Sequence, residues 1–158
     1  PAGWHRTYLD TLYKGNKLVE CGGVEVDGTP IDLTQVHTPV YIQAGREDHI
    51  APPQSVWKIM HHFSGPKRFV LAGSGHIAGV VNPPSSGKYQ YWVNDSDPAD
   101  LHEFIEGATE HKGSWWPDWL AWLKASDSTE VPAKGARQPG KGKLKAIEDA
   151  PGRYVKTR

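Results

Sequence analysis

The chain has 158 residues, enough for one domain with a hydrophobic core, and its 18 basic and 18 acidic residues give a formal net charge of zero. This balance excludes a general electrostatic attraction to nucleic acid or to anionic membranes. A single cysteine excludes an internal disulfide framework and fits a reducing compartment, and no stretch approaches the roughly 20 apolar residues of a transmembrane helix. We therefore expect a cytoplasmic protein without a membrane-spanning segment.

The N-terminal part is predicted to form small local elements. Residues 8–13 carry apolar side chains at the spacing of a short amphipathic helix, which Gly15 would end. Residues 18–26 favour a small extended segment, and residues 27–30 (Asp-Gly-Thr-Pro) are typical of a turn.

The strongest pattern is a strand, a helix and a second strand in the middle of the chain. Residues 40–44 and 68–72 are short apolar runs, typical of strands buried on both faces, and residues 53–63 have the periodicity of an amphipathic helix. This order predicts a βαβ unit, and hence an α/β protein with parallel strands and flanking helices. Two strands rarely form a stable sheet alone, and the chain begins at Pro1 rather than Met, so we expect it to be part of a larger protein.

The following segment is predicted to be a loop over residues 80–97 and a short helix over residues 101–105. Ser114 is predicted to cap a further helix. One face of that helix is apolar and is formed by Trp115, Trp116, Trp119, Leu120, Trp122 and Leu123. Such a stripe is typical of core packing, with the gripping of a hydrophobic partner or polymer as the alternative.

Three regions follow from these patterns. Residues 1–125 are predicted to be part of a catalytic domain, residues 126–146 a flexible basic linker, and residues 147–158 a C-terminal tail that docks back as a strap. The basic side chains of the linker are expected to be solvated, with contact to an anionic ligand as the alternative; they are Lys134, Arg137, Lys141, Lys143 and Lys145.

Asp48 and His76 are the candidate catalytic residues. Asp48 follows the first buried strand directly, and His76 follows the second. Functional groups collect at the carboxyl ends of strands in open α/β sheets, so both side chains are expected at the same sheet edge. An imidazole oriented by a carboxylate can take a proton from a Ser or Cys nucleophile. The plainer alternatives are that Asp48 only caps a turn or helix and that His76 is a structural side chain.

The order acid then histidine matches the α/β-hydrolase fold, in which a nucleophile in a Gly-x-[Ser/Cys]-x-Gly turn comes first. That turn is absent from this chain, so we expect the nucleophile upstream of Pro1. Cys21 is expected to be a structural thiol, because no helix follows it to lower its pKa and position 19 is Val rather than Gly.

Other polar residues are interpreted as structural. Adjacent positions on a helix cannot face one metal ion together, so His61 and His62 do not predict a metal site. Arg46 and Glu47 are expected to be scaffold for the Asp48 loop.

Four segments resemble the C-terminal part of the catalytic domain of class I polyhydroxyalkanoate synthases, in order and with similar spacing. They are Gly-Arg-Glu-Asp-His-Ile-Ala-Pro at 45–52, Gly-Ser-Gly-His-Ile-Ala-Gly-Val-Val-Asn-Pro-Pro at 73–84, His-Lys-Gly-Ser-Trp-Trp-Pro-Asp-Trp at 111–119 and Ala-Pro-Gly-Arg-Tyr-Val at 150–155.

The resemblance implies an acyltransferase that polymerises (R)-3-hydroxyacyl-CoA into polyester storage granules and releases CoA. It implies His76 as the base that activates an upstream cysteine, Asp48 as the residue that helps deprotonate the attacking 3-hydroxyl group, and His49 as a second-rank candidate. It also implies cytoplasmic localisation at the granule surface, a homodimer of the full-length protein, and no metal or organic cofactor.

Two alternatives remain open from the sequence. One is an ordinary α/β-hydrolase, such as an esterase or polyester depolymerase, with a serine nucleophile upstream. The other is a non-catalytic module that binds the granule surface or a partner through the tryptophan stripe. As part of such an acyltransferase, the 158 residues alone are expected to be inactive, because they lack the nucleophile.

Overall fold

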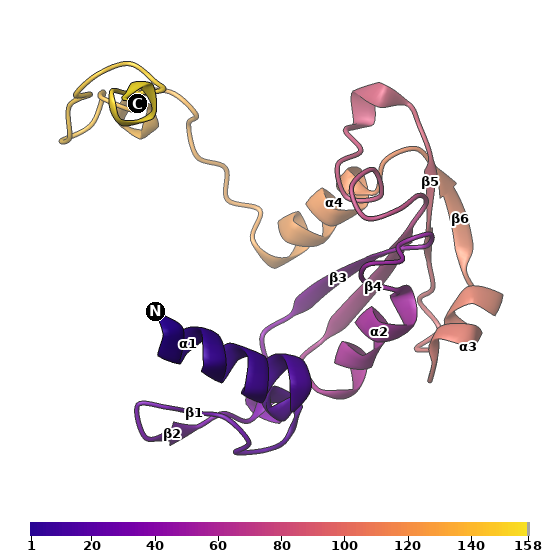
Figure 1. Ribbon diagram of the computed structural model, residues 1–158. Helices are drawn as coiled ribbons and strands as arrows, with labels where there is room; N and C mark the ends of the chain where they lie inside the picture. The colour runs from indigo at the N-terminus through magenta and orange to yellow at the C-terminus, as the bar shows by residue number, and fades with distance from the viewer. Residues whose placement is uncertain (158) are drawn as a thin grey trace. The chain divides into compact units, whose positions relative to one another are not determined.

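The computed structural model describes residues 1–157, so only Arg158, at the end of the predicted tail, lies outside it. The chain divides into two compact units, one of residues 1–120 and one that begins at residue 121, and each is described by itself. The first unit contains a four-stranded sheet of β3 (Val40–Gly45), β4 (Lys67–Ala72), β5 (Gln90–Val93) and β6 (Thr109–Lys112), in that order (Figure 1).

The sheet is mixed rather than parallel, which corrects the prediction from the sequence. β3 and β4 are parallel, as the βαβ pattern predicts, with Val40 opposite Lys67 and Gly45 opposite Ala72. β5 and β6 are each antiparallel to the preceding strand of the sheet. The physical reason is the connection: after β4 no helix crosses the sheet, and the chain instead returns through a loop from the end at which β4 stops.

Two short helices cover one face of the sheet. α2 (Pro53–Trp57) begins with proline at its first position and continues as a 3-10 turn, Lys58–His61. α3 (Leu101–Glu106) begins after Asp100, whose carboxylate accepts the backbone N–H of Glu103 at 2.9 Å. Both helices lie where the sequence predicts them, although the regular α-helical part of α2 is shorter than the predicted span of residues 53–63.

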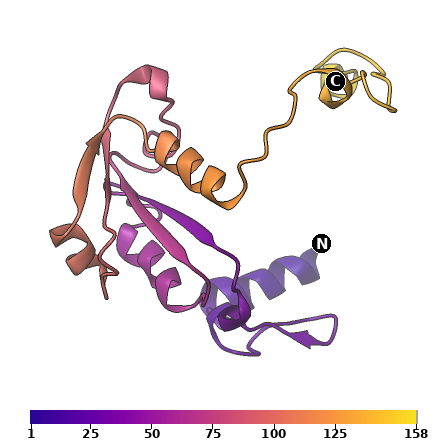
Figure 2. The ribbon, with the colours of Figure 1, turned by 180° about the vertical axis from the view of Figure 1, so that it is seen from behind.

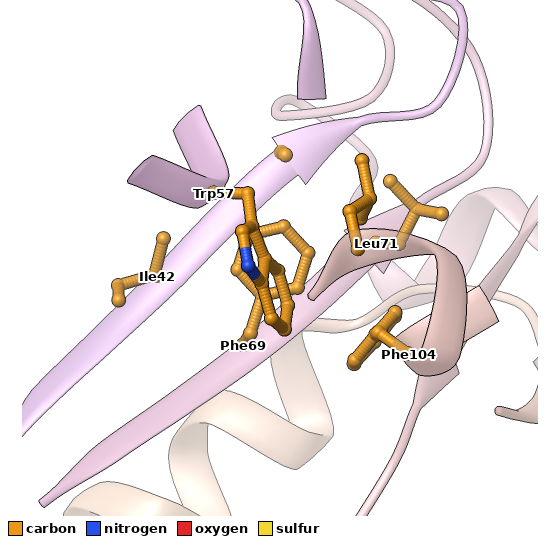
Figure 3. Packing of buried hydrophobic residues seen from close by; sticks show 7 residues of the cluster. Ile42, Trp57, Phe69, Leu71 and Phe104 are labelled. Atoms are coloured by element: carbon orange, nitrogen blue, oxygen red, sulfur yellow. The ribbon is translucent and has the colours of Figure 1, made fainter. Parts of the chain in front are cut away.

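The core lies between these helices and the sheet and is dominated by three aromatic rings. Trp57 from α2, Phe69 from β4 and Phe104 from α3 meet with ring centroids 4.8 to 5.5 Å apart, and Phe104 is only 1% exposed. Edge-to-face pairs of this kind add to the stabilisation from apolar burial. Ile42 and Leu71 fill the space beside the rings (Figure 3), so this cluster fixes β3 and β4 side by side.

The first turn of α4 (Trp116–Ser126) covers the opposite face of the sheet (Figures 1 and 2). The Ser114 hydroxyl accepts the backbone N–H of Trp116 at 3.1 Å, which confirms the predicted cap. Asp118 accepts hydrogen bonds from Tyr41 on β3 and Arg68 on β4. No residue of α4 is fully buried, and Trp119, Leu120 and Leu123 of the stripe are 41%, 50% and 37% exposed, so the expected core packing of the stripe is wrong.

The N-terminal segment is helical and then forms a hairpin. α1 (Ala2–Thr7) continues as a π-helical segment, Tyr8–Lys14, and ends at Gly15 as predicted. β1 (Glu25–Val26) and β2 (Thr29–Pro30) pair around Asp27 and Gly28, which both have positive φ angles, of 48° and 75°. The turn prediction is therefore confirmed, whereas the predicted extended segment over residues 18–26 is limited to the two residues of β1.

The second unit begins within α4 and continues as largely irregular chain. It has two 3-10 turns, Gly135–Arg137 and Tyr154–Lys156, and an ion pair between Arg153 and Glu148 at 3.3 Å. The boundaries predicted for the linker and tail stay predictions. Across residues 1–157, no helix is both long and apolar enough to cross a membrane.

Candidate active site

The site is built on the two loops that follow the parallel strands. The loop after β3 is held against the loop after β4 by two backbone hydrogen bonds, from Arg46 N–H to Ala72 O at 2.8 Å and from Glu47 N–H to Ser74 O at 3.2 Å. Gly45 permits this close approach, because a Cβ there would lie only 3.1 Å from the Ser74 carbonyl oxygen. The two loops therefore form one rigid edge.

Asp48 and His76 are in direct contact at this edge. Asp48 Oδ2 lies 2.8 Å from His76 Nδ1, and the other carboxylate oxygen accepts the backbone N–H groups of Ile50 and Ala51, each at 2.9 Å. The Asp48 side chain is 7% exposed, whereas that of His76 is 47% exposed. The carboxylate is thus buried and fixed, and the imidazole faces solvent.

These contacts keep Asp48 ionised. The backbone N–H of Ala51 is the main cause that lowers the pKa of Asp48, and the His76 ring and the Ile50 N–H lower it further against the opposing effect of burial. An ionised carboxylate accepts the proton on His76 Nδ1, so the lone pair of a neutral imidazole lies on Nε2. His76 is then oriented to act as a base through Nε2.

The turn that carries His76 is held from outside by two tryptophans. Trp115 Nε1 donates to Gly79 O at 2.9 Å, and Trp116 Nε1 donates to Val80 O at 3.0 Å. The sequence predicts these rings only as part of a packing or partner-binding stripe. Their contact with the His76 turn has no signal in the sequence, because 36 residues separate each donor from its acceptor.

The flanking residues of the loop after β3 have different surroundings. His49 is exposed beside Asp48. The Arg46 guanidinium lies 4.6 Å from the centroid of the Trp92 ring, a cation–π contact, while the backbone of Glu47 joins the two loops. Arg46 and Glu47 therefore act as scaffold, as the sequence indicates.

Cys21 lies in the N-terminal segment, away from this pair in the chain, and is exposed. The carboxylate of Asp32 raises the pKa of Cys21, so its reactive thiolate form is disfavoured. His61 and His62 lie at the end of the turn that follows α2, and within residues 1–157 no group of three or more His, Cys, Asp or Glu side chains is placed to hold a metal ion.

Comparison with known proteins finds similarity to poly(3-hydroxyalkanoate) polymerases along the whole chain. It is 43% identical to the poly(3-hydroxyalkanoate) polymerase subunit PhaC of Cupriavidus necator, and the match covers 100% of this chain and 26% of that protein. The chain is therefore homologous to part of the polyhydroxyalkanoate synthases.

Two further relatives agree. The PhaC subunits of Rhizobium meliloti and Rhizobium etli are 44% and 46% identical, over 100% and 98% of this chain. The chain spans about a quarter of the length of these curated relatives. No protein-family model matches it. The resemblance found in the four sequence segments is confirmed along the chain.

Proposed function

We propose that this chain supplies the general base and its carboxylate partner to an acyltransferase that polymerises (R)-3-hydroxyacyl-CoA into polyhydroxyalkanoate. The observation that carries the proposal is the contact of 2.8 Å between Asp48 and His76 at the ends of adjacent parallel strands. Homology to poly(3-hydroxyalkanoate) polymerases supplies the substrate class. The catalytic cysteine lies outside these 158 residues.

The first step is loading of an acyl group. His76 Nε2 takes the proton of the cysteine thiol, and the imidazolium that forms is stabilised by Asp48. The thiolate attacks the thioester carbonyl of the acyl-CoA, the bond to the CoA sulfur breaks, and the CoA thiolate leaves with a proton. One thioester is exchanged for another of similar energy, so loading needs no external driving force.

The second step extends the chain. The 3-hydroxyl group of one acyl unit must lose its proton before its oxygen can attack the thioester carbonyl of the other. The Asp48 and His76 pair is the base available for that proton, with Asp48 assisting as the resemblance implies. The ester bond forms, the cysteine sulfur leaves as thiolate, and the growing polyester is longer by one unit.

The fold that suits this role is the C-terminal part of an α/β-hydrolase domain. Acid and histidine follow consecutive parallel strands in the order expected for that fold. β3 lies at the edge of the described sheet, yet none of its residues is exposed and Ile42, Ala44 and Gly45 are buried, which fits a strand with a further neighbour in the complete protein.

The cellular setting follows from the same homology. We propose a cytoplasmic enzyme at the surface of the polyester granule that it makes, acting as a homodimer. A fluorescent fusion of the complete protein should collect on granules, and light scattering should give twice the monomer mass; diffuse fluorescence with a monomer mass would contradict both statements.

The test of the catalytic role uses the complete protein that contains this chain. His76→Ala and Asp48→Asn should each lower CoA release from 3-hydroxybutyryl-CoA by about 10²-fold or more. Cys21→Ala is the matched control and should keep wild-type turnover. Wild-type turnover in His76→Ala would refute the role, and release of free 3-hydroxy acid without polymer would indicate a hydrolase instead.

A further inference from the structure

The turn that carries His76 depends on few contacts of its own. Backbone hydrogen bonds from Gly79 to Gly75 and from Val81 to Ile77, each at 2.8 Å, close the turn. Ile77 and Val81 are 75% and 62% exposed, so these side chains do little to anchor the turn in the core. Something outside the turn must therefore hold it in place.

Two indole N–H groups bind this turn, one from Trp115 just before α4 and one from Trp116 at its first position. The carbonyl groups of Gly79 and Val80, three and four residues after His76, accept from Trp115 Nε1 and Trp116 Nε1. The two donors are adjacent in the chain and the two acceptors are adjacent as well. The turn is thus fastened at two consecutive peptide groups.

The tryptophans are themselves fixed to the strands that carry the site. The ring of Tyr41 on β3 stacks on Trp115, with centroids 5.9 Å apart. Asp118, in the first turn of α4, accepts from the Tyr41 hydroxyl at 2.8 Å and from Arg68 Nη2 on β4 at 2.6 Å. A continuous set of contacts therefore runs from β3 and β4 through α4 to the His76 turn.

We propose that Trp115 and Trp116 are positioning residues, which hold the His76 turn so that the imidazole stays aligned on Asp48 during turnover. The proposal rests on the proposed function of His76 as general base. The two indoles bind peptide carbonyls behind the histidine and act through the turn. A displacement of a catalytic group by about 1 Å lowers the rate about 10²-fold. Loss of the two hydrogen bonds that hold the His76 turn should therefore lower the rate, because the imidazole could then shift away from Asp48.

The experiment replaces each ring by phenylalanine in the complete protein. Trp115→Phe and Trp116→Phe keep an aromatic ring but remove the N–H donor. The control is Trp119→Phe, the same change within α4 at a ring that is 41% exposed and lies 6.2 Å from the Trp115 ring between centroids, an aromatic contact that phenylalanine can keep. In the double variant kcat for CoA release should fall by about 10-fold or more, with KM within about 2-fold and a melting temperature close to that of Trp119→Phe.

The amount of folded enzyme separates positioning from a loss of folded protein. Glu47 and His49, which flank Asp48 in the same loop, are unchanged in every variant. Turnover is therefore expressed per folded molecule, with the folded fraction measured by circular dichroism at the assay temperature. The loss of kcat should persist after this correction, whereas a smaller amount of folded enzyme would lower only the uncorrected rate.

Three results would overturn the positioning role: wild-type kcat in the double variant, a loss of kcat that disappears after correction for the folded fraction, or an equal loss in Trp119→Phe. His76→Ala is measured alongside. If it is inactive while the double variant is wild-type, only the positioning role fails. If His76→Ala keeps wild-type turnover, the proposed function fails and the positioning role with it.

Discussion

At the residue scale, Asp48 and His76 divide their roles by burial. The carboxylate is buried and takes three hydrogen bonds, from Ile50, Ala51 and His76, while the imidazole remains open to solvent on one side. A rigid acid can orient a histidine without becoming protonated itself, and an exposed histidine can reach a thiol on another segment. This asymmetry favours a catalytic pair over a purely structural one.

The lowered pKa of Asp48 predicts how the free energy of unfolding depends on pH. Its pKa in the folded protein lies below the unfolded value of about 3.9, so the ionised carboxylate stabilises the fold above about pH 4. That contribution is lost as the pH falls through the folded pKa. Asp48→Asn resembles the protonated acid, so it should lower the free energy of unfolding at pH 7 and lower it much less at pH 3. Urea unfolding of the wild type and the variant at both pH values checks this. If the two proteins differ in stability by the same amount at both pH values, ionisation of Asp48 is not the cause.

Asp32 controls the reactivity of Cys21 in a way that can also be measured. Its carboxylate is the main cause of the raised pKa of the Cys21 thiol. Asp32→Asn should lower that pKa, raise the thiolate fraction and speed alkylation by iodoacetamide at pH 7.5. Mass spectrometry of the peptide that contains Cys21 gives the rate, with Cys21→Ala as the blank. An unchanged or slower rate would remove Asp32 as the cause.

At the element scale, Asp118 joins α4 to the sheet. Burial raises its pKa, but the hydrogen bonds from Arg68 and Tyr41 more than offset this, so the pKa of Asp118 lies below its ordinary value. The same carboxylate raises the pKa of Tyr41, after burial, and that of Arg68. The three groups therefore hold one another in a fixed arrangement between β3, β4 and the first turn of α4.

This arrangement gives a matched pair of mutations. Arg68 pairs with Asp118, whose side chain is 15% exposed, and with Asp95, whose side chain is 79% exposed. Asp118→Asn should lower the free energy of unfolding by about 1–3 kcal/mol, because it leaves a half-buried guanidinium without its main partner. Asp95→Asn should cost at most about 1 kcal/mol, as is usual for exposed pairs. Chemical unfolding gives the free energy of unfolding of each variant. Similar losses in the two variants would show that Asp118 has no special role.

The elements that could be predicted from the sequence are those with a local pattern. The βαβ unit has apolar strands and a helix with apolar residues at regular spacing, and the structure confirms it. β5 lies in a stretch rich in Pro, Gly and Ser, and every residue of β6 is exposed. These two strands exist because they pair with each other and with β4, as Tyr91 does with His111. For β6 no local pattern reports this pairing, whereas Tyr91, Trp92 and Val93 of β5 are residues enriched in strands, so the prediction of a loop over residues 80–97 missed a local signal there.

At the scale of the whole molecule, the site was predictable for a topological reason. Parallel neighbours end at one edge of a sheet, so an Asp after one strand and a His after the next must approach each other whatever the sequence between them. The tryptophan contacts behind His76 could not be predicted in this way, because they depend on where α4 returns to the sheet. The nucleophile could not be located either, since the chain spans about a quarter of its relatives' length.

The proposed position of β3 within a larger sheet gives a prediction for hydrogen exchange. Val40 N–H and Arg46 N–H donate toward β4, to Pro66 O and Ala72 O at 2.9 and 2.8 Å. Amide direction alternates along a strand, so the N–H group of Gln43 points to the other side, where the described residues supply no strand.

In the complete protein a further strand should occupy that side, so the amide of Gln43 should exchange about as slowly as those of Val40 and Ile42. Hydrogen exchange followed by mass spectrometry at single-residue resolution makes the comparison, and neighbouring amides of the same strand serve as the control. If the amide of Gln43 exchanges orders of magnitude faster than its neighbours, β3 is a true edge strand and the α/β-hydrolase assignment loses its main support in the sheet.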